Sequence, residues 1–95
     1  MQSDIIRRRI VLYGRVQGVG LRWRAKTAAN TLGATGWVRN NFDGSVTMEL
    51  QGTEAQLDGV LLAVERGSYV MIENMRVKDL PVTEDEYGFT VRYDE

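Results

Sequence analysis

A glycine-rich stretch near the start of the chain holds the residue types best suited to chemistry. It reads Gly14-Arg-Val-Gln-Gly-Val-Gly-Leu-Arg22, with glycines at positions 14, 18 and 20. Glycine lets a chain turn tightly and brings bare main-chain amides close to a ligand. A helical pattern follows directly, and the free amides and dipole of a helix N-terminus attract anions. This glycine loop (residues 14–20) therefore predicts an anion-binding site, most naturally for a phosphate.

Arg22 falls in the first turn of the expected helix. Its planar guanidinium can hold an anion through two parallel donors. The loop lacks the Lys-Ser/Thr ending of a P-loop, and its spacing is not the dinucleotide-binding fingerprint. The glycines by themselves leave an ordinary strand-to-helix turn as an open alternative.

The amino-acid composition excludes several kinds of catalytic and metal-binding chemistry. Histidine and cysteine are both absent from the 95 residues. This excludes disulfides, thiolate nucleophiles and cysteine-ligated metals, and it removes the commonest general base. No apolar run is long enough to span a bilayer, and the N-terminus lacks a signal-peptide pattern. We therefore expect one domain over residues 1–95 in a cytoplasmic protein with no membrane partner.

The charges are unevenly distributed along the chain. Residues 1–40 carry eight positive side chains and one negative, whereas residues 41–95 carry four positive and twelve negative, for a net charge of −1. The positive half contains the glycine loop, which favours an anionic ligand. The alternative is that the two halves interleave in the fold and the asymmetry cancels.

Hydrophobic periodicity predicts the elements that must position the loop. Val46, Met48 and Leu50 alternate with polar residues, as in a half-buried strand, and Asp43-Gly44 before them favours a hairpin turn. The same analysis predicts strands at 5–13, 34–40, 45–51, 70–77 and 88–93, and helices at 21–32 and from Thr53 to Gly67. Residues 79–86 are expected to form a loop.

This order predicts an α+β fold of the ferredoxin-like βαββαβ type with a short extra C-terminal strand. The antiparallel sheet carries both helices on one face. The arginines at 7–9 are expected to lie in water on an outer face, and Trp23 and Trp37 are expected to be packing residues. Small size makes a monomer the expected state.

Three motifs together resemble the acylphosphatase family. They are the Gly14–Arg22 stretch, Leu32-Gly-Ala-Thr-Gly-Trp-Val-Arg-Asn40 and Asp43-Gly-Ser-Val46. The resemblance extends over the whole chain and implies a ferredoxin-like domain. It also implies an enzyme that hydrolyses a small-molecule acyl phosphate to a carboxylate and inorganic phosphate, with no metal or cofactor.

The resemblance assigns roles to residues at matching positions. Arg22 falls where the family binds phosphate, and Asn40 falls where it positions the attacking water. The main-chain amides that cradle the phosphate fall on Arg15, Val16, Gln17, Gly18, Val19, Gly20 and Leu21. Leu21 stands where the family usually has phenylalanine, and residues 67–75 fit the family pattern poorly.

Two other functions are weighed against this one. The first is a binding module that holds an anion or a nucleic acid without turnover. Nucleic acid is not expected, because the aromatic-rich RNA-binding strand motif is missing and the net charge is slightly negative. The second is an accessory domain like the acylphosphatase-like domain of hydrogenase-maturation carbamoyl transferases; a chain of this length without a linker argues against it.

Overall fold

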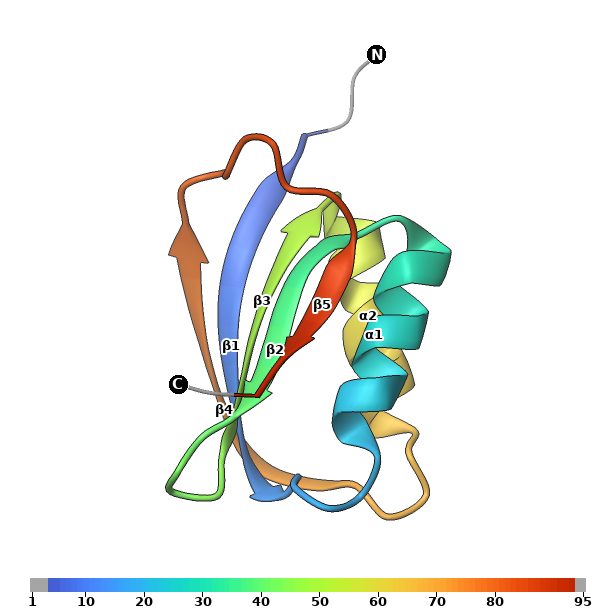
Figure 1. Ribbon diagram of the computed structural model, residues 1–95, viewed down its shortest axis with the longest axis vertical. Helices are drawn as coiled ribbons and strands as arrows, with labels where there is room; N and C mark the ends of the chain where they lie inside the picture. Colours follow the sequence, from blue (N-terminus) through green and yellow to red (C-terminus); the bar gives the residue numbers. More distant parts are fainter. Residues whose placement is uncertain (1–3, 94–95) are drawn as a thin grey trace.

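A five-stranded sheet with two helices on one face forms the body of the protein (Figure 1). The computed structural model describes residues 4–93; residues 1–3 and 94–95 of the expected domain lie outside this range. The elements are β1 (Ile6–Arg15), α1 (Leu21–Leu32), β2 (Thr35–Asn40), β3 (Val46–Gly52), α2 (Glu54–Glu65), β4 (Met71–Leu80) and β5 (Phe89–Arg92).

The strands lie in the order β4-β1-β3-β2-β5. β1 pairs antiparallel with β3 and β4, and β2 pairs antiparallel with β3. The α+β ferredoxin-like fold expected from the sequence is confirmed, with β5 as the extra strand. β5 runs parallel to β2, from Gly36 opposite Phe89 to Arg39 opposite Arg92, so the sheet is mixed.

The core lies between the sheet and the two helices. Alternate residues of β3 point into it: Val46, Met48 and Leu50 have no exposed surface. Ala25 and Ala29 of α1 are equally buried, and their small side chains let the helix approach the sheet closely. Burial of each large aliphatic side chain stabilises the fold by roughly 1.5–3 kcal/mol.

A glycine inside α2 has a packing reason. A Cβ on Gly59 would lie 2.8 Å from Cδ1 of Leu32 at the end of α1. The glycine therefore lets the two helices pack closely at this point. Leu32 itself is 41% exposed.

β4 extends further than its sequence pattern predicts. The strand continues to Leu80, because Lys78, Asp79 and Leu80 pair with Arg9, Arg8 and Arg7 of β1. The prediction of a loop from residue 79 was wrong at this end. β4 is an edge strand with polar side chains on both faces, so main-chain pairing rather than alternation defines it. A register shift at Tyr13/Gly14 accounts for the irregular alternation near its start.

The sheet face without helices, termed the open face, holds a cluster of paired charges. Arg7 is only 5% exposed. Its Nη2 lies 2.9 Å from Oε1 of Glu49, and its Nη1 lies 2.8 Å from Oε1 of Glu86 in the β4–β5 loop. The expectation that Arg7 lies in water was therefore wrong. Burial alone would raise the pKa of Glu49, but hydrogen bonds from Arg9 and Arg7 outweigh it and hold that pKa below its ordinary value.

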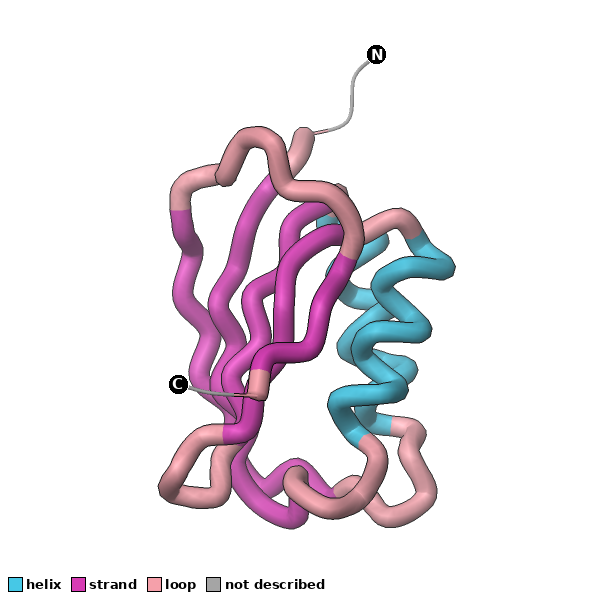
Figure 2. Tube along the Cα trace, in the orientation of Figure 1, coloured by secondary structure: helices cyan, strands magenta, loops and turns pink. Residues whose placement is uncertain are grey.

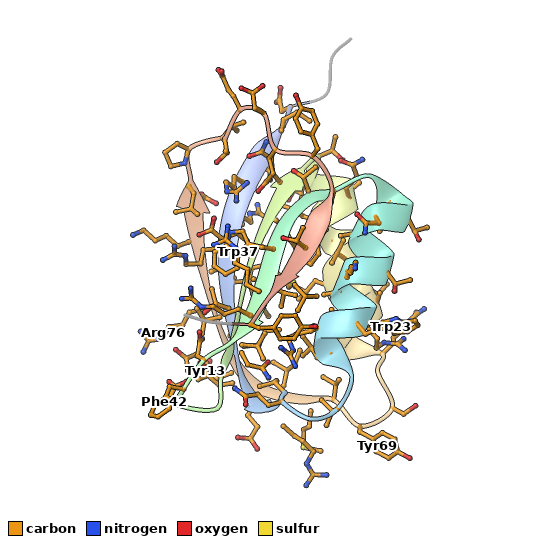
Figure 3. All side chains as sticks on the ribbon, viewed as in Figure 1. Tyr13, Trp23, Trp37, Phe42, Tyr69 and Arg76 are labelled. Atoms are coloured by element: carbon orange, nitrogen blue, oxygen red, sulfur yellow. The ribbon has the colours of Figure 1, made fainter. Side chains whose placement is uncertain are left out.

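The two tryptophans have different environments (Figure 3). Trp37 lies on the open face, is 6% exposed, and has the guanidinium groups of Arg39 and Arg92 over its ring at 5.2 and 4.3 Å. Its expected packing role is confirmed. Trp23 is 66% exposed on α1 and is not a core residue.

Candidate active site

The glycine loop enters α1 through two left-handed residues. Gly18 has φ 72° and Gly20, the N-cap of α1, has φ 77°. A Cβ at either position would meet nothing within 4 Å, so the demand for glycine is conformational rather than steric. The loop turns back on itself and presents its main chain to the space in front of α1.

Residues 17–20 leave their amides available. Within residues 4–93, none of these four amides donates a hydrogen bond to a main-chain acceptor. The first amides of a helix also have no partner inside it, and the macrodipole adds partial positive charge there. The loop and the start of α1 together form a set of donors suited to an anion.

The glycine loop and the β2–β3 turn lie at the same end of the molecule (Figure 2). Two hydrogen bonds from Gln17 join them. Nε2 of Gln17 donates to the carbonyl oxygens of Asn41 and Ser45 at 2.8 and 2.9 Å. Asp43 accepts hydrogen bonds from the hydroxyl and amide of Ser45, which hold the pKa of Asp43 below its ordinary value. These contacts fix the end of β2, and with it Asn40, beside the loop.

A pocket of about 460 Å³ opens between the loop, the start of α1 and the ends of β2 and β5. Arg22 and Asn40 reach it from different elements, eighteen positions apart in the chain. The full lining is Val16, Gly18, Gly20, Leu21, Arg22, Trp23, Lys26, Asn40, Thr90, Val91 and Tyr93. Two of these described residues are cations and none is an acid, so the pocket favours an anionic ligand.

Asn40 lines the pocket and carries an acceptor that no described residue uses. Its Oδ1 is buried and has no hydrogen-bond partner among the residues that the structure describes. A buried polar atom left unpaired costs about 1–3 kcal/mol. A water molecule or substrate that donates to this atom would recover that energy.

Arg22 is held from one side by the last residue of the described chain. Its guanidinium lies 5.1 Å from the ring centroid of Tyr93, within the range of a cation–π contact. Tyr93 also lines the pocket. This contact does not use the N–H donors of Arg22, and no described residue accepts a hydrogen bond from them.

The expected site residues divide into two groups. The pocket brings together Val16, Gly18, Gly20, Leu21, Arg22 and Asn40. The side chains of three others do not line it. Arg15 is the last residue of β1 and pairs with Met71 of β4. Gln17 donates a hydrogen bond to the β2–β3 turn, and Val19 packs against the core.

Sequence reasoning missed the far wall of the pocket. Lys26, Thr90, Val91 and Tyr93 line it, and Trp23, expected to be a packing residue, does so as well. The spacing from Arg22 to Lys26 is i, i+4, which places both on one helix face, and this signal was available in the sequence. Nothing local marks the residues of β5, because their place depends on the parallel pairing with β2.

Within residues 4–93, no group of three or more His, Cys, Asp and Glu side chains could hold a metal ion. The same residues contain no helix that is long and apolar enough to cross a membrane.

The fold and the pocket define a ferredoxin-like α+β protein with a cationic pocket at a loop–helix junction. Comparison with known proteins agrees. The acylphosphatase family model matches residues 8–91. An acylphosphatase of Geobacillus kaustophilus is 39% identical over 85 residues, covering 88% of this chain and 90% of that protein.

Solved structures of acylphosphatases have a similar fold. The crystal structure of acylphosphatase from Bacillus subtilis has a TM-score of 0.84 at 31% identity, covering 93% of this chain and 99% of that one. Full-length HypF in its phosphate- and nucleotide-bound form also reaches 0.84, over 99% of this chain and 13% of that one. At 24% identity this similarity concerns the fold alone.

The chain belongs to the acylphosphatase family. The family and the acylphosphatase activity that the sequence predicted are confirmed by these relatives.

Proposed function

We propose that this chain hydrolyses the carboxyl-phosphate bond of acyl phosphates with the phosphoryl group in the glycine loop. The amides of residues 17–20 and the N-terminus of α1 contact the phosphoryl oxygens, and Arg22 binds them through its planar donors. Phosphoryl transfer mostly requires positioning and charge stabilisation. Donors fixed by the fold before the substrate arrives supply both.

Asn40 positions the nucleophile. Oδ1 of Asn40 accepts a hydrogen bond from a water molecule, which attacks phosphorus in line with the leaving oxygen. The bond between phosphorus and the acyl oxygen breaks, and the carboxylate leaves with the electron pair. The proton of the water passes to a phosphoryl oxygen, and the products are the carboxylate and inorganic phosphate.

This mechanism needs no titrating side chain. A carboxylate is a good leaving group and demands little acid catalysis, and an asparagine amide keeps one protonation state. The proposal requires neither a metal ion nor an organic cofactor, so turnover is expected to survive EDTA.

The observation that carries these roles is the buried Oδ1 of Asn40, which has no hydrogen-bond partner among residues 4–93, on a residue that lines the same pocket as Arg22. A buried acceptor without a hydrogen-bond partner is costly unless a ligand uses it. Leu21, which stands where the family usually has phenylalanine, is 2% exposed and packs in the core.

The test is hydrolysis of benzoyl phosphate in EDTA by the wild type, Arg22→Ala and Asn40→Ala. Wild-type turnover with a large loss in both folded variants supports the roles. Full activity in either variant would overturn its role. Arg22→Lys is the matched control, because it keeps the charge and loses the two-pronged geometry.

The single domain over 1–95, the monomeric state, the cytoplasmic location and the lack of a nucleic-acid partner stay predictions. Light scattering on the purified chain tests the monomer. A salt-dependent shift of a labelled RNA would contradict the expected lack of nucleic-acid binding.

A further inference from the structure

The pocket is larger than its phosphate end requires. One water takes about 30 Å³ of liquid volume, so a phosphoryl group fills only a minor part of about 460 Å³. The remainder extends along α1 toward β5. Its walls carry Trp23, Lys26, Thr90 and Tyr93. This part of the pocket, termed the acyl chamber, is where the organic part of an acyl phosphate would lie.

Lys26 gives the acyl chamber a positive charge. It lies one helical turn beyond Arg22, so both side chains rise from the same face of α1. Lys26 is exposed and forms no salt bridge with any residue in the range 4–93. None of the described residues that line the pocket is acidic.

The cations at the start of α1 differ in their partners. Arg24 points toward the other helix, where its Nε donates to the carbonyl oxygen of Ala63 at 3.0 Å. Arg22 and Lys26 both line the pocket instead. Like charges four residues apart repel each other, and cations near a helix N-terminus oppose the macrodipole. A ligand with two anionic groups would relieve both effects.

We propose that Lys26 binds a second anionic group on the acyl moiety. The preferred substrates are then monophosphates of dicarboxylic acids, with the phosphoryl group at Arg22 and the free carboxylate at Lys26. The hydroxyl groups of Thr90 and Tyr93 offer further donors in the same chamber. Lys26 is a specificity-determining residue that does not touch the reacting atoms.

The helix spacing favours a short acyl group. Side chains at i and i+4 have Cβ atoms about 5–6 Å apart. A substrate whose two anionic ends are a few bonds apart, such as succinyl phosphate, matches this spacing. This inference rests on the proposed function, since it assumes that the phosphoryl group lies at Arg22.

The experiment compares kcat/KM for succinyl phosphate and 4-methylpentanoyl phosphate, in which an uncharged isopropyl group of similar size replaces the carboxylate. We expect the wild type to prefer succinyl phosphate by about 10-fold, mainly through KM, because the contact is the same in the ground and transition states. The preference should shrink as salt rises.

Lys26→Met should reduce this preference to about 2-fold or less, because it should lower kcat/KM for succinyl phosphate more than for 4-methylpentanoyl phosphate. Lys26→Arg should retain most of it. The matched control is Lys78→Met on β4, which removes the same charge outside the pocket and should leave the preference intact.

The two failures are distinguishable. Hydrolysis of both substrates with no preference in the wild type, or a preference that persists in Lys26→Met, would overturn the role of Lys26 alone. If the folded wild type hydrolyses neither substrate, the proposed function fails and this inference fails with it.

Discussion

The two helices of this protein are equally long but begin in opposite ways. α2 starts at Thr53, whose Oγ1 accepts from the amide of Gln56 at 3.2 Å while Oε1 of Gln56 accepts from the amide of Thr53 at 2.8 Å. Glu54 follows in its first turn. α1 starts at Gly20 in the left-handed conformation, with no side-chain cap and no acidic residue in its first turn.

The N-terminus of α2 is built for stability, whereas that of α1 is suited to binding. The reciprocal cap of α2 is worth about 1 kcal/mol, and an acid near a helix N-terminus adds about 0.3–1 kcal/mol. α1 has neither the side-chain cap nor the first-turn acid, and Arg22 lies where the helix dipole is already positive. Its amides and its charge stay available, so the helix start that is poorer for stability is the one suited to binding an anion.

Arg22→Ala is expected to have the largest effect on activity. It should lower kcat/KM for benzoyl phosphate by on the order of 1,000-fold, as for a group that stabilises transferring phosphoryl oxygens. Stability should change by less than about 1 kcal/mol, because relief of the unfavourable dipole interaction offsets the lost contact with Tyr93. Kinetics and urea unfolding of the same preparation check both parts. A loss of activity explained by unfolding would contradict the comparison.

Asn40→Ala should lower kcat by on the order of 100-fold, since one hydrogen-bonding group in the transition state is lost. The variant also removes the orphaned Oδ1, so its free energy of unfolding should not fall by the amount typical of a lost hydrogen bond. Thermal unfolding alongside single-turnover kinetics tests this. A strongly destabilised variant would show that Asn40 serves the fold instead.

Trp23→Glu makes the start of α1 resemble the start of α2, because it adds an acid to the first helical turn. The carboxylate should stabilise the helix by a few tenths of a kcal/mol and oppose the anionic substrate, raising KM about 10-fold. Trp23→Gln removes the indole without adding charge and is the control. An equal rise in KM for both variants would mean that the indole, and not the charge, matters.

Thr53→Ala is expected to have no effect on activity. Loss of the cap should lower the free energy of unfolding by about 1 kcal/mol. For a domain of this size, that corresponds to a fall in Tm of about 4–8 °C. Benzoyl phosphate turnover at 25 °C should match the wild type. A fall in kcat of the folded variant would show that the two helix starts are not functionally distinct.

The sequence by itself determined the local features. Glycines at 18 and 20 ahead of Arg22 indicate an anion site because the residue types and the loop conformation are contained within a few positions. The alternation in residues 45–51 and the Thr53 cap likewise depend on near neighbours. These patterns were sufficient to predict the order of elements and the ferredoxin-like fold.

Only the tertiary structure decided which distant residues meet. The burial of Arg7 depends on Glu49 and Glu86, which lie 42 and 79 positions away. The acyl chamber depends on the parallel register that brings β5 beside β2, and the free acceptor of Asn40 depends on what surrounds it. Local patterns report on neighbours along the chain, whereas sheet register and helix packing bring together residues that no local pattern connects.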